Sequence, residues 1–265
     1  IKLLKKLCAM NFDKLIYELN DIDEILIDEI KNRLHDYNFC IIRGLLDPKL
    51  IKIAIDSKLS DYVKNNTDSS TTGENPSEIR NIFMKMSIGN ARHGGVIRPR
   101  FKRVIYNPMN RTNTFGLDFV FERLAQVRNV LSNKDKNFAI YKIEEGLWTA
   151  ARIHQFPVGG GFMTLHKDTV LPNILKDKKF SGSFFQPLAL LTQKFEDFEK
   201  GGGIALINKD IVEYENFANR GDIVIYDSNS IHGVQDIDTH LKFEQRSIKG
   251  RISGLATLYE MRNDS

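Results

Sequence analysis

The sequence predicts an α+β fold in which several helices pack against a jelly-roll-like core of strands. Two observations support this prediction. Apolar residues recur at helical spacing in the first half of the chain, whereas short apolar or alternating runs separated by turn residues fill the second half. Helices followed by strands favour segregated layers, and seven or more short strands favour a sandwich or barrel.

The first half is predicted to contain three helices and one strand. Apolar periodicity places helices over residues 21–34, 47–63 and 117–131, and Asp47-Pro48 caps the second of them. An apolar run over residues 39–42 ends at Gly44 and predicts a strand between the first two helices. Residues 65–77 are polar and turn-rich, so we expect a mobile loop there.

The second half is predicted to be a series of short strands. The runs that indicate them lie at residues 138–143, 149–156, 162–165, 183–192, 203–207, 222–226 and 251–259. No linker, internal repeat or low-complexity tract divides the chain. We therefore expect a single domain.

Composition excludes several classes of protein. Of the 265 residues, 42% are hydrophobic and 27% are charged, which is typical of a folded globular chain. Cys8 and Cys40 form no CxxC motif, so we expect free thiols and a cytoplasmic location. No apolar run approaches the ~20 residues that span a bilayer, and no signal peptide is evident. A net charge of +4 is too small to indicate a nucleic-acid partner.

One stretch is strongly basic. Residues 79–117 contain no acid but include Arg80, Lys85, Arg92, Arg98, Arg100, Lys102, Arg103 and Arg111. On an extended segment Arg98, Arg100 and Lys102 would share one face, where two guanidinium groups suit a carboxylate or phosphate. We therefore expect this stretch to border a substrate pocket and to recognise an anionic group. A solvated basic surface is an equally good interpretation.

Three residues have the chemistry of a metal site. His166 and Asp168 are two residues apart on a predicted strand, so both side chains point to the same face. One such pair is expected by chance, and a histidine between apolar neighbours, such as His232, is more often a core residue. Together, however, two histidines and one carboxylate form a set that leaves three positions open on Fe(II).

A carboxylate-binding pair follows on the last predicted strand. Arg251 and Ser253 share a face, and a guanidinium beside a hydroxyl suits the capture of a carboxylate. Arg246 is an alternative anchor. Arg251 is preferred because of its strand context and its serine partner.

These motifs resemble the Fe(II)/2-oxoglutarate-dependent dioxygenases, in particular their prolyl-hydroxylase-like and phytanoyl-CoA-hydroxylase-like branches. The resemblance lies in residues 156–168 (FPVGGGFMTLHKD), in the glycine-rich turn and strand at 200–206 (KGGGIAL) and in the helix-to-strand segment 34–46. It implies one catalytic domain over 1–265, with a double-stranded β-helix (cupin-like) core at 137–262. Residues 1–136 would supply helical support and a basic loop region.

The resemblance also implies an activity. Iron would be held by His166, Asp168 and His232, and 2-oxoglutarate would chelate it and pair its far carboxylate with Arg251 and Ser253. Oxygen would then be used to hydroxylate an unactivated C–H bond, with release of succinate. The resemblance does not choose the substrate, and we expect a small anionic or zwitterionic metabolite, such as an amino acid or small acid. The presence of a carboxylate at position 168 implies hydroxylation rather than halogenation.

Two departures from the family leave alternatives open. The gap between His232 and Arg251 is long and contains Arg246, and Phe156 stands where some relatives place a tyrosine. Further pocket residues are therefore sought nearby, at Arg152, His154 and Gln155. An AlkB-like nucleic-acid or protein demethylase and a non-catalytic jelly-roll binding protein are the competing interpretations.

Overall fold

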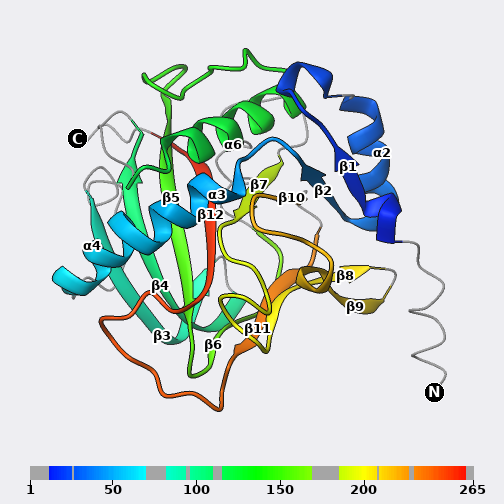
Figure 1. The fold of residues 1–265 in the computed structure, drawn as a ribbon. Helices are drawn as coiled ribbons and strands as arrows, with labels where there is room; N and C mark the ends of the chain where they lie inside the picture. The colour runs from blue at the N-terminus through cyan, green and yellow to red at the C-terminus, as the bar shows by residue number, and fades with distance from the viewer. Residues whose placement is uncertain are drawn as a thin grey trace.

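The computed structural model describes residues 12–25, 27–69, 82–93, 96–109, 115–168, 185–207, 209–226 and 230–260. The predictions made for Cys8, Arg80, Arg111 and residues 70–77 lie outside these ranges. Within them, helices cover one side of a long, rolled sheet (Figure 1). No helix in the described residues is long and apolar enough to cross a membrane.

The predicted helices form close to their expected bounds. The first is split into a 3-10 turn, Ile22–Glu24, and α2, Ile27–Tyr37. The second runs through α3, Pro48–Ala54, a π-helical segment, Ile55–Leu59, and α4, Ser60–Asn65. The Asp47 side chain accepts the Lys49 and Leu50 backbone N–H groups, which is the expected cap. The third is α6, Asp118–Leu131.

The twelve strands of the described residues form one sheet, whose order is β1-β2-β10-β7-β12-β5-β4-β6-β11-β8-β9, with β3 paired to β4. Every pair is antiparallel except β1–β2. This arrangement is a strand-rich α+β fold of the expected jelly-roll type. The bounds are β1 Ile16–Glu18, β2 Phe39–Arg43, β3 Phe83–His93, β4 Val96–Pro108, β5 Leu147–Pro157, β6 Gly161–His166, β7 Gln186–Leu190, β8 Gly202–Ile207, β9 Asp210–Glu213, β10 Ile223–Tyr226, β11 His232–Ile237 and β12 Gly250–Glu260.

Helix α6 closes the main core by packing on β12 and β7 (Figure 1). Phe121 and Leu124 are fully buried in the same cluster as Ile252 and Ala256 of β12. A Cβ at Gly254 would lie 3.2 Å from the Phe121 ring, so glycine at this position lets the helix approach the sheet. Burial of each large side chain contributes about 1.5–3 kcal/mol.

The predicted strand at 138–143 is wrong. This segment forms turns, and strand β5 begins only at Leu147. Ala139 has a positive φ of 53°, and its backbone N–H donates to the Glu144 carboxylate at 2.6 Å. Phe138 and Ile140 are nevertheless buried. The apolar run therefore reflects a buried turn rather than a strand.

The predicted basic loop region is also wrong in its conformation. Much of it forms a long hairpin of β3 and β4, paired without a register shift from Phe83–Tyr106 to His93–Val96. Basic residues on the inward face of β4 replace the apolar ones that would have indicated a strand. The loop prediction failed because this strand faces a polar cavity.

The free thiol of Cys40 lies on β2, in the core. Burial raises its pKa to about 12, so it remains protonated and unreactive.

Candidate metal and carboxylate site

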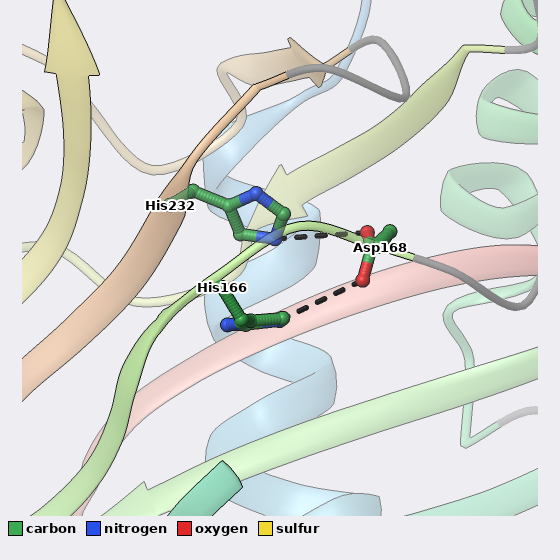
Figure 2. A group of neighbouring side chains, drawn as sticks. All are labelled: His166, Asp168 and His232. Carbon is green, nitrogen blue, oxygen red and sulfur yellow. Dashed lines mark ion pairs between the residues drawn. The ribbon is translucent and has the colours of Figure 1, made fainter. Parts of the chain in front are cut away.

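The three predicted metal ligands lie together at the ends of two paired strands. His166 is the last residue of β6 and His232 the first of β11, and the two are direct cross-strand partners. Asp168 follows β6 and reaches both imidazoles, as Figure 2 shows. Its two carboxylate oxygens lie 3.6 Å from His166 Nε2 and 3.6 Å from His232 Nε2. All three donor atoms lie within 4.8 Å of one another.

Backbone carbonyls orient both imidazoles. His166 Nδ1 lies 2.8 Å from Thr164 O, and His232 Nδ1 lies 3.3 Å from Ser230 O. Because a carbonyl only accepts, each Nδ1 carries the proton and each Nε2 lone pair faces Asp168. This arrangement is the one in which histidines bind metal ions.

The electrostatics of the cluster favour a neutral His232 and an ionised Asp168. Burial lowers the pKa of His232 to about 4, against the opposing effect of Asp168. Burial would raise the pKa of Asp168, but His232, His166 and Arg98 together hold it well below its usual value. At neutral pH His232 and Asp168 are therefore in the forms that bind a divalent cation.

The metal ligands open into a cavity of about 890 Å³, a volume that includes its mouth. The wall contains apolar side chains, including Met163, Leu188, Val234 and Leu255, as well as several charged ones. Both Arg251 and Ser253 line the same cavity.

Arg251 is a buried cation held by three partners. Its Nε donates to Glu215 Oε1 at 2.6 Å, while its Nη1 and Nη2 donate to Ser253 Oγ and Tyr214 Oη at 3.2 Å. Burial would lower its pKa, but Glu215 and the neighbouring tyrosines raise it above the usual value. Its guanidinium lies 5.3 Å from the Phe156 ring centroid, so the residue in the tyrosine position contributes a cation–π contact. Arg246 is exposed in the long loop and does not line the cavity.

Three residues of this network were not predicted. Tyr226 stacks on His232 with ring centroids 4.2 Å apart and donates to Tyr214 Oη at 2.8 Å. Glu215 is the middle residue of the 3-10 turn Tyr214–Asn216. The sequence contained one signal for Tyr214, the glycine-rich motif at 200–206, because a Cβ at Gly203 would overlap the Tyr214 ring. Two tyrosines thus connect His232, a candidate metal ligand, to Arg251, the candidate carboxylate anchor.

The predicted substrate residues divide between two faces. Arg98 and Arg100 of β4 and Arg152 and His154 of β5 line the cavity. The prediction that Gln155 is a pocket residue is wrong, because its side chain lies on the opposite face of β5. Its amide accepts from Arg103 and donates to the carbonyls of residues 247 and 249, so it supports the loop after β11. Strand alternation separates it from its neighbour His154.

The structure is similar to a prolyl-4-hydroxylase from Pseudomonas putida, with a TM-score of 0.50 and 13% identity over 90% of this chain and all of that one. The chain has the prolyl hydroxylase fold. It is also similar to a prolyl hydroxylase from Trichoplax adhaerens in complex with a hypoxia inducible factor peptide fragment, with a TM-score of 0.50, 14% identity, and 87% and 88% of the two chains covered. No protein-family model matches the sequence, and no curated protein does.

These two solved structures therefore share their fold with this chain, in line with the prolyl-hydroxylase-like pattern noted in the sequence. Identity at this level shows the shared fold, and the chemistry must be argued from the site.

We expect the buried His154 to make the protein sensitive to acid. Burial, with nearby cations, lowers its pKa well below the usual value. The unfolded chain takes up this proton near pH 6.5 and the folded one does not, so stability falls as the pH drops below about 6.5. Denaturant unfolding at several pH values measures this effect. Below pH 6.5 the free energy of unfolding should fall less steeply with decreasing pH in His154→Gln than in the parent protein, by up to about 1.4 kcal/mol per pH unit. An unchanged slope would contradict a neutral His154.

Proposed function

We propose that the protein is an Fe(II)/2-oxoglutarate-dependent oxygenase that hydroxylates a C–H bond of a small anionic or zwitterionic metabolite. One observation carries this proposal. A cluster of two histidines and a carboxylate shares a cavity with a buried arginine and serine, so one bound molecule can reach both. We further infer that the rolled sheet is a double-stranded β-helix.

The residues fit the metal that the proposal requires. Two imidazoles and a carboxylate are the donor set of the non-haem iron oxygenases, and they occupy one side of the ion. The Nε2 atoms and the Asp168 oxygens converge, while the hydrogen bonds of both rings to backbone carbonyls are made by their Nδ1 atoms. His166, Asp168 and His232 would hold the iron.

When bound, Fe(II) and 2-oxoglutarate supply the oxidising chemistry, in which 2-oxoglutarate is decarboxylated to succinate and oxygen is inserted into a C–H bond. The chain supplies orientation. Arg251 and Ser253 pair with the distal carboxylate, while Glu215 fixes the guanidinium through its Nε. Apolar residues such as Leu188 and Val234 restrict access of water to the cavity.

The position of the basic residues favours a small molecule over a nucleic acid. Arg98 and Lys102 are 5% and 4% exposed and lie inside the cavity. Single-stranded nucleic acid binds in an exposed basic groove, and this face of β4 does not provide one.

The proposed activity is tested by succinate formation. The purified protein with Fe(II), ascorbate and 2-oxoglutarate should release succinate slowly, through decarboxylation that is not coupled to hydroxylation of a substrate. Succinate release should be faster when a true substrate is present. A panel of amino acids and small acids would identify it. Absence of succinate under every condition, with metal bound, would instead support a non-catalytic binding protein.

A further inference from the structure

Asp168 differs from the other two candidate metal ligands in how its backbone is held. His166 and His232 lie on paired strands, and each imidazole also contacts a backbone carbonyl. Asp168 lies two residues beyond the end of β6. Among the described residues, the backbone of residues 167 and 168 makes no hydrogen bond to another main-chain group. The sheet therefore does not fix Asp168, and its orientation depends on side-chain contacts.

One such contact comes from Arg98 on strand β4. Its Nη2 donates to the Lys167 carbonyl oxygen at 2.5 Å, and the residue is only 5% exposed. This carbonyl belongs to the peptide bond that joins Lys167 to Asp168. Because a peptide unit is planar, fixing its oxygen also fixes the position of the following Cα atom. Arg98 thereby orients the backbone from which the Asp168 carboxylate projects.

Strand pairing explains why Arg98 reaches this carbonyl. β4 and β6 are antiparallel neighbours, with Arg100 opposite Met163. Continuing this register by two residues sets Arg98 opposite Leu165, next to the end of β6. An arginine side chain is long enough to extend from that level past the last residue of the strand.

The charges of Arg98 and Asp168 also interact. Burial lowers the pKa of Arg98, whereas the charge of Asp168 raises it. Burial raises the pKa of Asp168, whereas His232, His166 and the charge of Arg98 lower it. The two side chains therefore belong to one electrostatic unit within the cavity that both of them line.

A cation beside a metal site has two opposite effects on metal affinity. Its repulsion of the metal ion weakens binding, whereas its orientation of a ligand strengthens binding. Removing a residue that orients a metal ligand typically costs about 10–100-fold in metal affinity. We therefore expect orientation to outweigh repulsion.

We infer, on the basis of the metal site in the proposed function, that Arg98 is a positioning residue for Asp168 and acts through the Lys167 carbonyl. The sequence had suggested a substrate-binding role for this arginine. Arg100 is the next residue of β4 that lines the cavity, and it is less buried. Since Arg100 makes no hydrogen bond to the described residues 167 and 168, it provides a matched control.

The first test is a titration with Co(II), followed by visible absorption. Arg98→Met removes the donor and the charge but keeps an unbranched stem, and it should weaken Co(II) binding by about 10–100-fold. Arg98→Lys can still donate to a single carbonyl, so it should recover most of the affinity. Arg100→Met removes the same charge from the same cavity and should bind Co(II) at least as tightly as the parent protein.

Far-ultraviolet circular dichroism should confirm the fold of each variant. Parental Co(II) affinity in folded Arg98→Met, or an equal loss in Arg100→Met, would overturn the inference. Failure of Arg98→Lys to bind Co(II) more tightly than Arg98→Met would also count against it.

A double-mutant comparison separates positioning from a general structural role. If Arg98 acts through Asp168, adding Arg98→Met to Asp168→Ala should cause no further loss of Co(II) affinity, because the carboxylate that Arg98 orients is already absent. A further loss as large as that in the parent background would show that Arg98 supports the fold instead.

Succinate formation by the parent protein distinguishes this inference from the proposed function. Co(II) binding that depends on Arg98, together with no succinate under any condition, would refute the oxygenase and leave the positioning role standing. Conversely, succinate release by a parent protein whose Co(II) affinity is the same in Arg98→Met would refute the positioning role alone. A parent protein that binds no Co(II) would remove the metal site on which both rest.

Discussion

Alanine in place of His166 or His232 should abolish iron-dependent conversion of 2-oxoglutarate to succinate, with a loss greater than about a hundredfold. Removing one imidazole takes away a third of the protein ligands, whereas changing only an outer partner of a ligand already costs about 10–100-fold. Metal stoichiometry, measured by titration with Co(II) and its visible absorption, should fall in parallel with activity.

His35→Ala is the matched control, because this imidazole is 88% exposed on α2, away from the cavity. It should leave both activity and Co(II) binding unchanged. Since the two ligand variants remove partly buried imidazoles, far-ultraviolet circular dichroism should accompany each measurement. Full activity in folded His166→Ala or His232→Ala would remove the basis for the metal assignment.

The second large effect is expected at Arg251. Arg251→Ala should weaken 2-oxoglutarate binding by about 2–5 kcal/mol, because a buried carboxylate would lose its charged partner. Isothermal titration of 2-oxoglutarate into the Mn(II)-loaded protein measures the change directly. Arg246→Ala should have almost no effect, since that side chain is exposed.

Arg251→Ala also leaves the buried Glu215 carboxylate without its arginine partner. The resulting loss of stability must therefore be separated from the loss of 2-oxoglutarate binding. Arg251→Lys keeps the charge but cannot reach Glu215, Ser253 and Tyr214 together, because an ammonium lacks the planar fork of a guanidinium. It should fold better than Arg251→Ala and still bind 2-oxoglutarate weakly. A larger effect from Arg246→Ala than from Arg251→Ala would reverse the assignment of the anchor.

The local chemistry of the sequence was sufficient to predict the helices and most strands. The Asp47 cap and the apolar stripe of α6 were found from spacing alone. The strand at 138–143 was wrong because burial in a turn and burial in a strand give the same apolar run. The β3–β4 hairpin was missed because its cavity-facing residues are basic.

For the candidate site, residue types and spacing indicated the groups that share a strand face. Arg251 and Ser253 are such a pair, whereas Asp168 lies just beyond the end of β6 and so is not on the strand as predicted. The structure still brings this pair and the pair of His166 and Asp168 to one cavity. The sequence alone did not predict the roles of Tyr214, Glu215 and Tyr226, because those roles depend on contacts between segments that are distant in sequence. Gln155 was assigned to the pocket because nearness in sequence says nothing about which face a side chain occupies.

The cross-strand pairing of His166 with His232 makes assembly of the site an all-or-none event. Side chains alternate along a strand, so slipping β11 by one residue against β6 would turn His232 out of the cavity. Irregularities at Val234 and Ile237 fix the register, as does the closeness of Gly233 to the Met163 carbonyl, 2.8 Å from where a Cβ would lie. If these residues bind iron as proposed, all three ligands come together only once β6 and β11 have paired in this register.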